Sequence, residues 1–338
     1  MKCVKVPLRE LNDTRIKLME KGLMNMEYRI KACDDYGYIP INENIDGYEI
    51  VCMHLEAMKK VPHNFSELLE DELTDEEIEN LRTSFDTIGD IVILEIPDDL
   101  VDKNQIIGDA ALKFTKRKAI YMKKSAVKGT TRVRDLEFLS GVDDSVTIHK
   151  EHGARLKLDV REVYFSPRLA TERKRVMESV CDGETILDMF CGIGPFPIVI
   201  AKNKNVDITA VDINQAAIRY LDENIKLNKL KGNIRTYCGD IREVSESFNT
   251  KFDRIIMNLP GLAYTFLDVA FHLIEDNGII NYYEFSDSYE QGINRLKEAC
   301  EKEGKQIEII STRKVKSTSP GEWHVAIDAR ITSENIEN

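Results

Sequence analysis

The feature that most constrains the fold is a repeating pattern from about Tyr164 onward, in which short apolar runs alternate with segments of helical periodicity. Alternating strands and helices build a parallel sheet with helices packed on both of its faces. We therefore expect an α/β unit of doubly wound, Rossmann-like architecture over residues 164–338. The expected strands are 185–190, 207–211, 234–237, 254–257 and 279–283, followed by 306–311 and 323–331, with helices such as 215–227 and 263–274 between them.

The first of these strands runs directly into a glycine-bearing turn. Asp188 is the last polar residue of the strand, and Gly192 and Gly194 follow within a few residues. Glycine lets the backbone approach a ligand where a Cβ atom would clash. Pro195 suits the first turn of the next helix, where its missing N–H is not needed. Because ligands bind at the carboxyl ends of strands in such sheets, this turn predicts one side of a ligand site.

Polar residues also follow the next three strands. Asp212 comes ~20 residues after the glycine turn, where an acid can hold both ribose hydroxyls of an adenosine. Asp240 follows the third strand and can accept a hydrogen bond from the adenine amino group, and Asn258 follows the fourth. This ordered set resembles the Rossmann-like methyltransferases and therefore predicts S-adenosyl-L-methionine as the cofactor. The expected cofactor-binding residues are Arg173, Asp188, Phe190, Gly192, Gly194, Asp212, Ile213, Asp240, Ile241 and Asn258.

Residues 1–163 read as two smaller α+β domains, with an expected boundary between residues 60 and 61. In 1–60, a strand at 3–6 precedes a helix from about residue 12 to 24 and a hairpin around 33–37. In 61–163, Thr74 and Glu77 have the spacing of a helix capping box. A strand at 91–96, a helix at 104–118 and a hairpin around 151–153 follow. Nothing in 1–60 points to catalysis.

The charge of the chain is unevenly distributed. The net charge is −12, which taken alone argues against a nucleic-acid binder. Residues 66–80 carry eight acids and no base, whereas residues 116–134 carry eight bases and no acid. An acidic chain with one concentrated basic stretch can still bind a polyanion locally. The alternative interpretation is an ordinary solvated face.

Several classes of protein are disfavoured by the sequence. No apolar run approaches the roughly 18 residues that span a bilayer, and the N-terminus does not resemble a signal peptide. The seven cysteines form no CxxC pair, so neither a disulfide framework nor a metal site is expected. We expect a cytoplasmic protein that does not associate with membranes.

Several short motifs carry further information: 164–169 (Tyr-Phe-Ser-Pro-Arg-Leu), 171–173 (Thr-Glu-Arg), 132–137, 147–151 and 258–260 (Asn-Leu-Pro). Together they resemble one family in particular, the archaeal and eukaryotic tRNA (guanine-37-N1)-methyltransferases. The resemblance implies a first domain, 1–60, that touches the outer corner of tRNA. It implies an RNA-binding domain, 61–163, and a Rossmann-like class I methyltransferase domain, 164–338. Gly261 departs from the pattern, since a larger residue is expected after Asn-Leu-Pro.

The resemblance also implies roles for individual residues. N1 of guanine carries a proton, and its removal pushes negative charge toward O6, so the reaction needs a base near N1 and a cation near O6. The target base must also be flipped out of its stack. The resemblance assigns Glu172 as the base, Arg132 as the O6 donor and Asn258 as the residue that orients the base. The expected RNA contacts are Lys116, Lys118, Lys123, Lys124, Lys128, Arg134, Tyr164 and Arg168.

The sequence is also compatible with other functions. A related enzyme transfers the aminocarboxypropyl group of the same cofactor in wyosine synthesis, and some relatives methylate a tricyclic guanosine. A non-catalytic RNA-binding protein is an alternative of another class. A nicotinamide oxidoreductase is disfavoured because the first loop lacks the third glycine of Gly-x-Gly-x-x-Gly. The expected partner is tRNA, bound through its anticodon stem-loop and L-shaped body, and the protein is expected to be a monomer.

Overall fold

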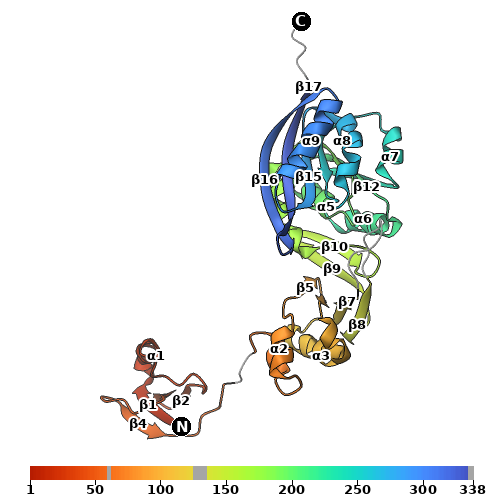
Figure 1. Ribbon diagram of the computed structural model, residues 1–338. Helices are drawn as coiled ribbons and strands as arrows, with labels where there is room; N and C mark the ends of the chain where they lie inside the picture. Colours follow the sequence, from red (N-terminus) through yellow and green to blue (C-terminus); the bar gives the residue numbers. More distant parts are fainter. Residues whose placement is uncertain (59–61, 125–134, 334–338) are drawn as a thin grey trace. The chain divides into compact units, whose positions relative to one another are not determined.

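The structure is a computed structural model that describes residues 1–58, 62–124 and 135–333 (Figure 1). The chain separates into two compact units, 1–67 and 68–338. The first boundary therefore falls a few residues after the one expected from the sequence, and the expected boundary at 163/164 lies inside the second unit. In the part of the chain that the structure describes, no helix has both the length and the apolar character needed to cross a membrane.

The first unit is built on a four-stranded antiparallel sheet in the order β2-β3-β1-β4, counted within the described residues. Its helix packs on the sheet through Leu18, against Val4 and Ile39. The helix ends at Glu20, earlier than predicted, because Gly22 takes a positive φ of 67° and turns the chain. The elements are β1 (Lys2–Pro7), α1 (Leu11–Glu20), β2 (Lys31–Cys33), β3 (Tyr36–Pro40) and β4 (Glu49–Cys52).

The second unit begins with a small α+β layer. Its sheet has the order β5-β6-β7-β8 in the residues that the structure describes. The predicted capping box forms, with Thr74 and Glu77 bonded to each other's backbone N–H groups. The predicted helix ends at Thr115 because Lys116 adopts a left-handed φ of 53°. The elements are α2 (Asp75–Asn80), β5 (Asp86–Ile88), β6 (Ile91–Leu94), α3 (Asn104–Thr115), β7 (Ala119–Lys123) and β8 (Leu136–Gly141).

A two-stranded hairpin, β9 (Val146–Glu151) and β10 (Ala154–Asp159), follows this layer. His152 and Gly153 both have positive φ, as a two-residue hairpin turn requires. One end of β9 is bonded to the small layer, because Thr147 Oγ1 donates to Asp90 at 2.6 Å. The predicted hairpin is confirmed. It lies between the small α+β layer and the large sheet of this unit (Figure 1).

The large sheet has seven strands in the described residues, in the order β13-β12-β11-β14-β15-β17-β16. The first five are parallel, as predicted. The expectation of a parallel sheet is wrong for β17, which runs antiparallel to both of its neighbours, β15 and β16. Only two residues, 320 and 321, separate β16 from β17, and such a short turn can join only antiparallel strands. The strands are β11 (Thr185–Asp188), β12 (Asp207–Asp212), β13 (Asn233–Cys238), β14 (Phe252–Met257), β15 (Ile274–Ser286), β16 (Lys305–Ser319) and β17 (Glu322–Ser333).

Helices cover both faces of this sheet because successive strand residues point to opposite sides. Ile186 and Ile256 pack toward α4 and α5, whereas their neighbours Leu187 and Ile255 pack toward α8 and α9. The strand order reverses beside β11, so the loops that follow β11 and β14 diverge and leave room for a ligand. The helices are α4 (Ala170–Ser179), α5 (Pro195–Asn203), α6 (Gln215–Leu227), α7 (Ile241–Val244), α8 (Leu267–Leu273) and α9 (Glu290–Lys302).

Asn224 of α6 is fully buried and bonds three backbone groups. Its Oδ1 accepts from Lys157 N at 2.6 Å, and its Nδ2 donates to the carbonyls of Lys157 and Ile193, each at 3.1 Å. It therefore ties the hairpin to the glycine turn. We predict that Asn224→Ala lowers the unfolding free energy by about 1–3 kcal/mol, because it leaves buried groups unpaired.

Asn228, one turn later, is the matched control for this prediction. It bonds Arg155 of the same hairpin but is partly exposed, so water can replace its contacts in Asn228→Ala. Urea unfolding can be followed by the fluorescence of Trp323, the only tryptophan of the chain, which lies in β17. Equal losses in the two variants would contradict the anchoring role of Asn224.

Candidate cofactor and substrate site

A cavity of about 310 Å³ opens where the parallel strands end. Its wall is formed by the turns after β11, β12, β13 and β14, and by the segment that leads into α4. The structure thus brings residues from distant parts of the sequence to one edge of the sheet, as predicted. The predicted site residues in the wall are Tyr164, Arg173, Phe190, Gly192, Asp212, Ile213, Asp240, Ile241 and Asn258.

The two glycines of the first turn have different surroundings. Gly192 lines the cavity with a φ of 55°, and an added Cβ would meet nothing within 4 Å. Gly194 is not in the wall. A Cβ there would lie 2.2 Å from Cδ1 of Leu221 in α6, and the φ of 82° also disfavours a side chain. Gly192 therefore leaves space for a ligand, whereas Gly194 permits the close packing of α5 against α6.

The carboxylate of Asp212 is held in place by the backbone. Its Oδ2 accepts from Gly192 N at 2.7 Å, and its Oδ1 accepts from Asn214 N at 2.8 Å. Asp240 caps α7, with Oδ1 accepting from Arg242 N at 2.9 Å. Both carboxylates belong to the cavity wall, so each can meet the hydroxyl or amino groups of a nucleoside.

Asp188 and Asn258 each carry a buried oxygen with no hydrogen-bond partner among the described residues, namely Asp188 Oδ2 and Asn258 Oδ1. Burial raises the pKa of Asp188 to about 8. The amide of Phe190 opposes this change, and the negative charge of Asp212 adds to it. Buried acceptors without partners are rare in folded proteins, and here they suit a cationic ligand. Asn258 lines the cavity, whereas Asp188 lies behind the wall next to Phe190. S-adenosylmethionine carries a sulfonium and an ammonium group, so these residues fit it.

Arg173 is the most firmly held residue of the wall. Its Nε and Nη2 donate to Glu151 of β9 at 2.5 and 2.6 Å, and its Nη2 also donates to the carbonyl of Ser166 at 3.1 Å. Although burial opposes ionisation, hydrogen bonds from His149 and Arg173 lower the pKa of Glu151 to about 2. Arg173 and Glu151 therefore form a buried, bidentate ion pair. Reasoning from the sequence did not identify Glu151 as a site residue, although it lies in the motif 147–151.

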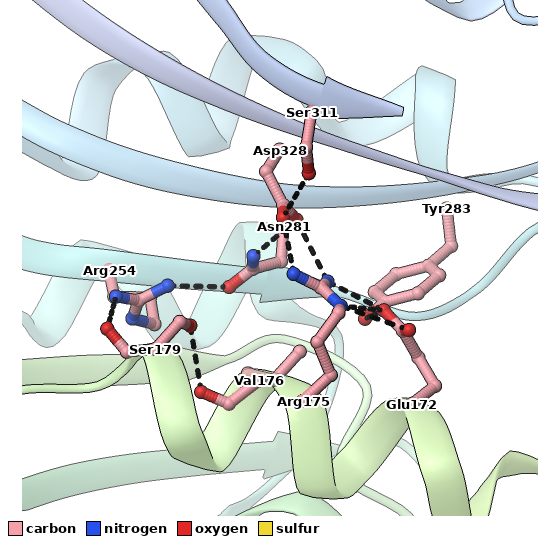
Figure 2. Close-up of polar contacts among 9 residues, drawn as sticks. All are labelled: Glu172, Arg175, Val176, Ser179, Arg254, Asn281, Tyr283, Ser311 and Asp328. Carbon is pink, nitrogen blue, oxygen red and sulfur yellow. Dashed lines mark hydrogen bonds and ion pairs between the residues drawn. The ribbon is translucent and has the colours of Figure 1, made fainter. Parts of the chain in front are cut away.

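Glu172, the predicted base, is buried but does not belong to the cavity wall among the described residues. It lies on the sheet side of α4, where Arg175 donates to both of its oxygens and the Tyr283 hydroxyl donates to Oε1 at 2.8 Å (Figure 2). Arg132, the predicted O6 donor, lies outside the described residues, as do Lys128 and Arg134. The catalytic assignments therefore stay predictions.

The described part of the basic stretch is largely paired with acids. Lys118 Nζ lies 3.1 Å from Asp144, and Lys124 Nζ lies 2.7 Å from Glu137. Lys123 contacts Asp86 and Glu95, and Arg168 also bonds Asp86, at 2.5 Å. Lys116 is exposed. The charge run therefore does not form one open cationic face in the described residues, because acids distant in sequence fold against it.

The structure adds wall residues that sequence reasoning missed. They come from the loop after Asn258 and from the C-terminal strands. These strands line the cavity because the strand order places them next to one another beyond β14, which the sequence does not reveal. The basic run 313–316 at the end of β16 was the one available signal. Gly261 has open space around its Cα, so its small size is not required by packing. The additional residues include Leu262, Thr265, Phe266, Phe285, Lys316 and His324.

Family models match most of the chain in three successive segments. The TRM5/TYW2 methyltransferase domain matches residues 147–310, the TYW2 N-terminal domain matches 65–145, and the tRNA methyltransferase 5 N-terminal domain matches 3–49. The chain belongs to the TRM5/TYW2 methyltransferase family. Membership confirms the predicted class I methyltransferase fold with smaller preceding domains, and S-adenosylmethionine as its cofactor.

Individual relatives agree with this family. The tRNA (guanine(37)-N(1))-methyltransferase Trm5b of Pyrococcus abyssi is 42% identical, over 97% of this chain and 98% of its own. The solved complex of aTrm5 with tRNALeu has 37% identity and a TM-score of 0.86, covering 98% of this chain and 99% of the other. A tRNA(Phe) (4-demethylwyosine(37)-C(7)) aminocarboxypropyltransferase of Methanocaldococcus jannaschii is 37% identical, over 73% of this chain and 97% of its own.

The raised pKa of Asp188 makes cofactor binding sensitive to pH. With a pKa of about 8, Asp188 is mostly protonated at pH 7 in the cofactor-free protein. A cationic ligand favours the ionised carboxylate, so binding S-adenosylmethionine at pH 7 should release most of one proton. Above about pH 9 the carboxyl is already ionised, and the release should disappear.

Calorimetry in two buffers of different ionisation enthalpy measures this release directly. Asp188→Asn removes the titrating group while keeping the shape of the side chain, and its binding heat should be independent of the buffer. If the wild-type protein binds the cofactor at pH 7 with no buffer dependence, Asp188 does not couple to the bound charge.

Proposed function

We propose that this chain transfers the methyl group of S-adenosylmethionine to N1 of guanosine-37 in tRNA, next to the anticodon. The observation that carries this proposal is the extent of the match. A relative named for this activity aligns with 97% of the chain, and the tRNA methyltransferase 5 N-terminal model matches residues 3–49. The likeness therefore includes the first unit as well as the methyltransferase fold.

Aminocarboxypropyl transfer is disfavoured by the same comparison. The aminocarboxypropyltransferase relative is matched over 97% of its own length but covers only 73% of this chain, so it is the shorter protein. The present chain has additional residues that match the model named for the N-terminal domain of tRNA methyltransferase 5. The methyltransferase domain model alone includes both kinds of enzyme and does not distinguish them.

The reaction assigns a separate task to each group of the site. S-adenosylmethionine would supply an electrophilic methyl group on a positively charged sulfur, and the carbon–sulfur bond that breaks would leave the neutral thioether S-adenosylhomocysteine. Asn258, in the wall with its Oδ1 unpaired among the described residues, orients the target base. Glu172 accepts the N1 proton as the N1–carbon bond forms, and Arg132 stabilises the negative charge that develops on O6. Tyr164, also in the wall, offers a ring against which the flipped base can stack.

The rest of the chain serves tRNA binding in this proposal. The first unit contacts the body of the tRNA, and the region 61–163 grips the anticodon stem-loop with Lys116, Lys128 and Arg134. Four of the expected RNA contacts already bond acids in the structure, so phosphates would have to compete with those acids for their charge. They are Lys118, Lys123, Lys124 and Arg168. The monomeric state and the cytoplasmic location stay predictions.

One incubation tests the proposed activity. The protein is mixed with methyl-labelled S-adenosylmethionine and unmodified tRNA, and the tRNA is then digested to nucleosides. We expect the label in 1-methylguanosine, and tRNA with adenosine in place of guanosine-37 should stay unlabelled. Label in another nucleoside, or an aminocarboxypropyl product, would replace the proposal, and tRNA binding without any product would indicate a non-catalytic binding protein.

The base assignment is tested by Glu172→Gln, which keeps the shape of the side chain but cannot accept a proton. Single-turnover methyl transfer should slow by about 10²–10⁴-fold, the usual contribution of a positioned base. Arg132→Ala should cost on the order of 10²–10³-fold through the lost O6 donor. Affinities for tRNA and cofactor, measured separately, should change little. A near wild-type rate in Glu172→Gln would remove Glu172 from the mechanism.

A further inference from the structure

A buried ionic network lies between α4 and the large sheet, next to the cavity wall, because His324 of the wall packs on Tyr283 of the network. Arg175 stands between two carboxylates, Glu172 of its own helix and Asp328 of β17 (Figure 2). The side chains of Glu172 and Asp328 are only 4% and 8% exposed. Burying two carboxylates around one guanidinium is unfavourable unless every group is paired. The arrangement therefore has an energetic cost that an apolar contact in the same place would not have.

The two oxygens of Glu172 are bonded unequally. Oε1 accepts from Arg175 Nη2 at 2.6 Å, from Arg175 Nε at 3.2 Å and from the Tyr283 hydroxyl at 2.8 Å. Oε2 accepts only from Arg175 Nε, at 3.1 Å, among the described residues. Each carboxylate oxygen has two lone pairs, so Oε1 is saturated and Oε2 retains capacity. These bonds therefore leave Oε2 of Glu172 with more remaining acceptor capacity than Oε1.

Arg175 is itself held from the other side by the sheet. Its Nη1 and Nη2 donate to Asp328 at 2.5 and 3.1 Å. Asp328 also accepts from Asn281 of β15 at 2.6 Å and from Ser311 of β16 at 2.8 Å. Although burial opposes it, these donors, Arg175 first, lower the pKa of Asp328. Asp328 is thus ionised and competes with Glu172 for the charge of Arg175.

We propose that Arg175, Tyr283 and Asp328 are positioning residues that orient the carboxylate of Glu172, leave its Oε2 to accept the N1 proton and balance the charge around it. This inference rests on the proposed role of Glu172. A carboxylate that has an arginine to itself is a weak base. Because Asp328 takes part of the guanidinium charge, it opposes the effect of Arg175 on Glu172. The groups that face Glu172 are Arg175, Tyr283, Asp328 through Arg175, and the His324 ring that packs on Tyr283.

The proposal predicts shifts of opposite sign in the pH dependence of single-turnover methyl transfer, measured at saturating tRNA and cofactor. Asp328→Asn leaves Arg175 wholly to Glu172, so the midpoint of the rising limb should move to lower pH by about 1 unit, with a lower plateau rate. Arg175→Gln removes the cation, so the midpoint should move to higher pH by a similar amount. Tyr283→Phe removes one donor to Oε1 and should move it in the same direction as Arg175→Gln, by less.

Controls separate this role from a structural one. Arg254 belongs to the same buried network through Asn281 but does not contact Glu172, and Arg254→Lys should lower thermal stability without moving the pH midpoint. If Arg175→Gln does not fold, Arg175→Lys replaces it. A point charge cannot form the fork to both carboxylates, so Arg175→Lys should lower the plateau rate while tRNA affinity is retained.

The outcomes distinguish this inference from the proposed function. If Glu172→Gln is slow but Asp328→Asn and Tyr283→Phe keep the wild-type midpoint, the positioning role is wrong and the base assignment stands. If Asp328→Asn and Arg175→Gln shift the midpoint in the same direction, the charge-sharing account is wrong. If Glu172→Gln reacts at the wild-type rate, the base assignment falls and the positioning role falls with it.

Discussion

The arrangement of the site depends on the buried ion pair between Arg173 and Glu151. Both side chains are almost completely withdrawn from water, and two such charges are tolerated only when each satisfies the other. The fork connects β9 to the first turns of α4, and the bond from Arg173 to the Ser166 carbonyl adds the segment that carries Tyr164. One contact thereby joins the hairpin, the segment that leads into the helix and the helix itself into a single wall of the cavity.

Helix α4 presents different chemistry on different sides because neighbouring residues are rotated by about 100°. Arg173 points to the hairpin and the cavity wall. Glu172 and Arg175, three residues apart, share the side that faces the sheet and meet Tyr283 and Asp328 there. The helix therefore connects the cavity wall with a buried charge network. That network needs partners from the sheet, Tyr283 and Asp328, in addition to the residues of α4.

The parts of the site that could be predicted are those determined locally. Gly192 and Asp212 each follow a recognisable strand, and parallel strands bring their carboxyl ends to one edge, so the meeting of these residues needs no further information. Gly194 was predicted to bind the cofactor, and its packing role was missed because its partner Leu221 lies in another helix. The lysines of the basic stretch were read as a run of like charge, whereas Asp144 in the loop after β8 contacts Lys118 and Glu137 in β8 contacts Lys124.

By itself, the sequence determined the alternation of strands and helices, the glycine turn and the acids at the strand ends, because each depends on neighbours within a few residues. Only the tertiary structure decided that β17 enters the sheet between β15 and β16, and that Asp328 thereby arrives beside Arg175. It also decided which charges are neutralised and which oxygen of Glu172 keeps a lone pair. These properties depend on the distance between groups far apart in the chain, and that distance is set by how the whole sheet packs.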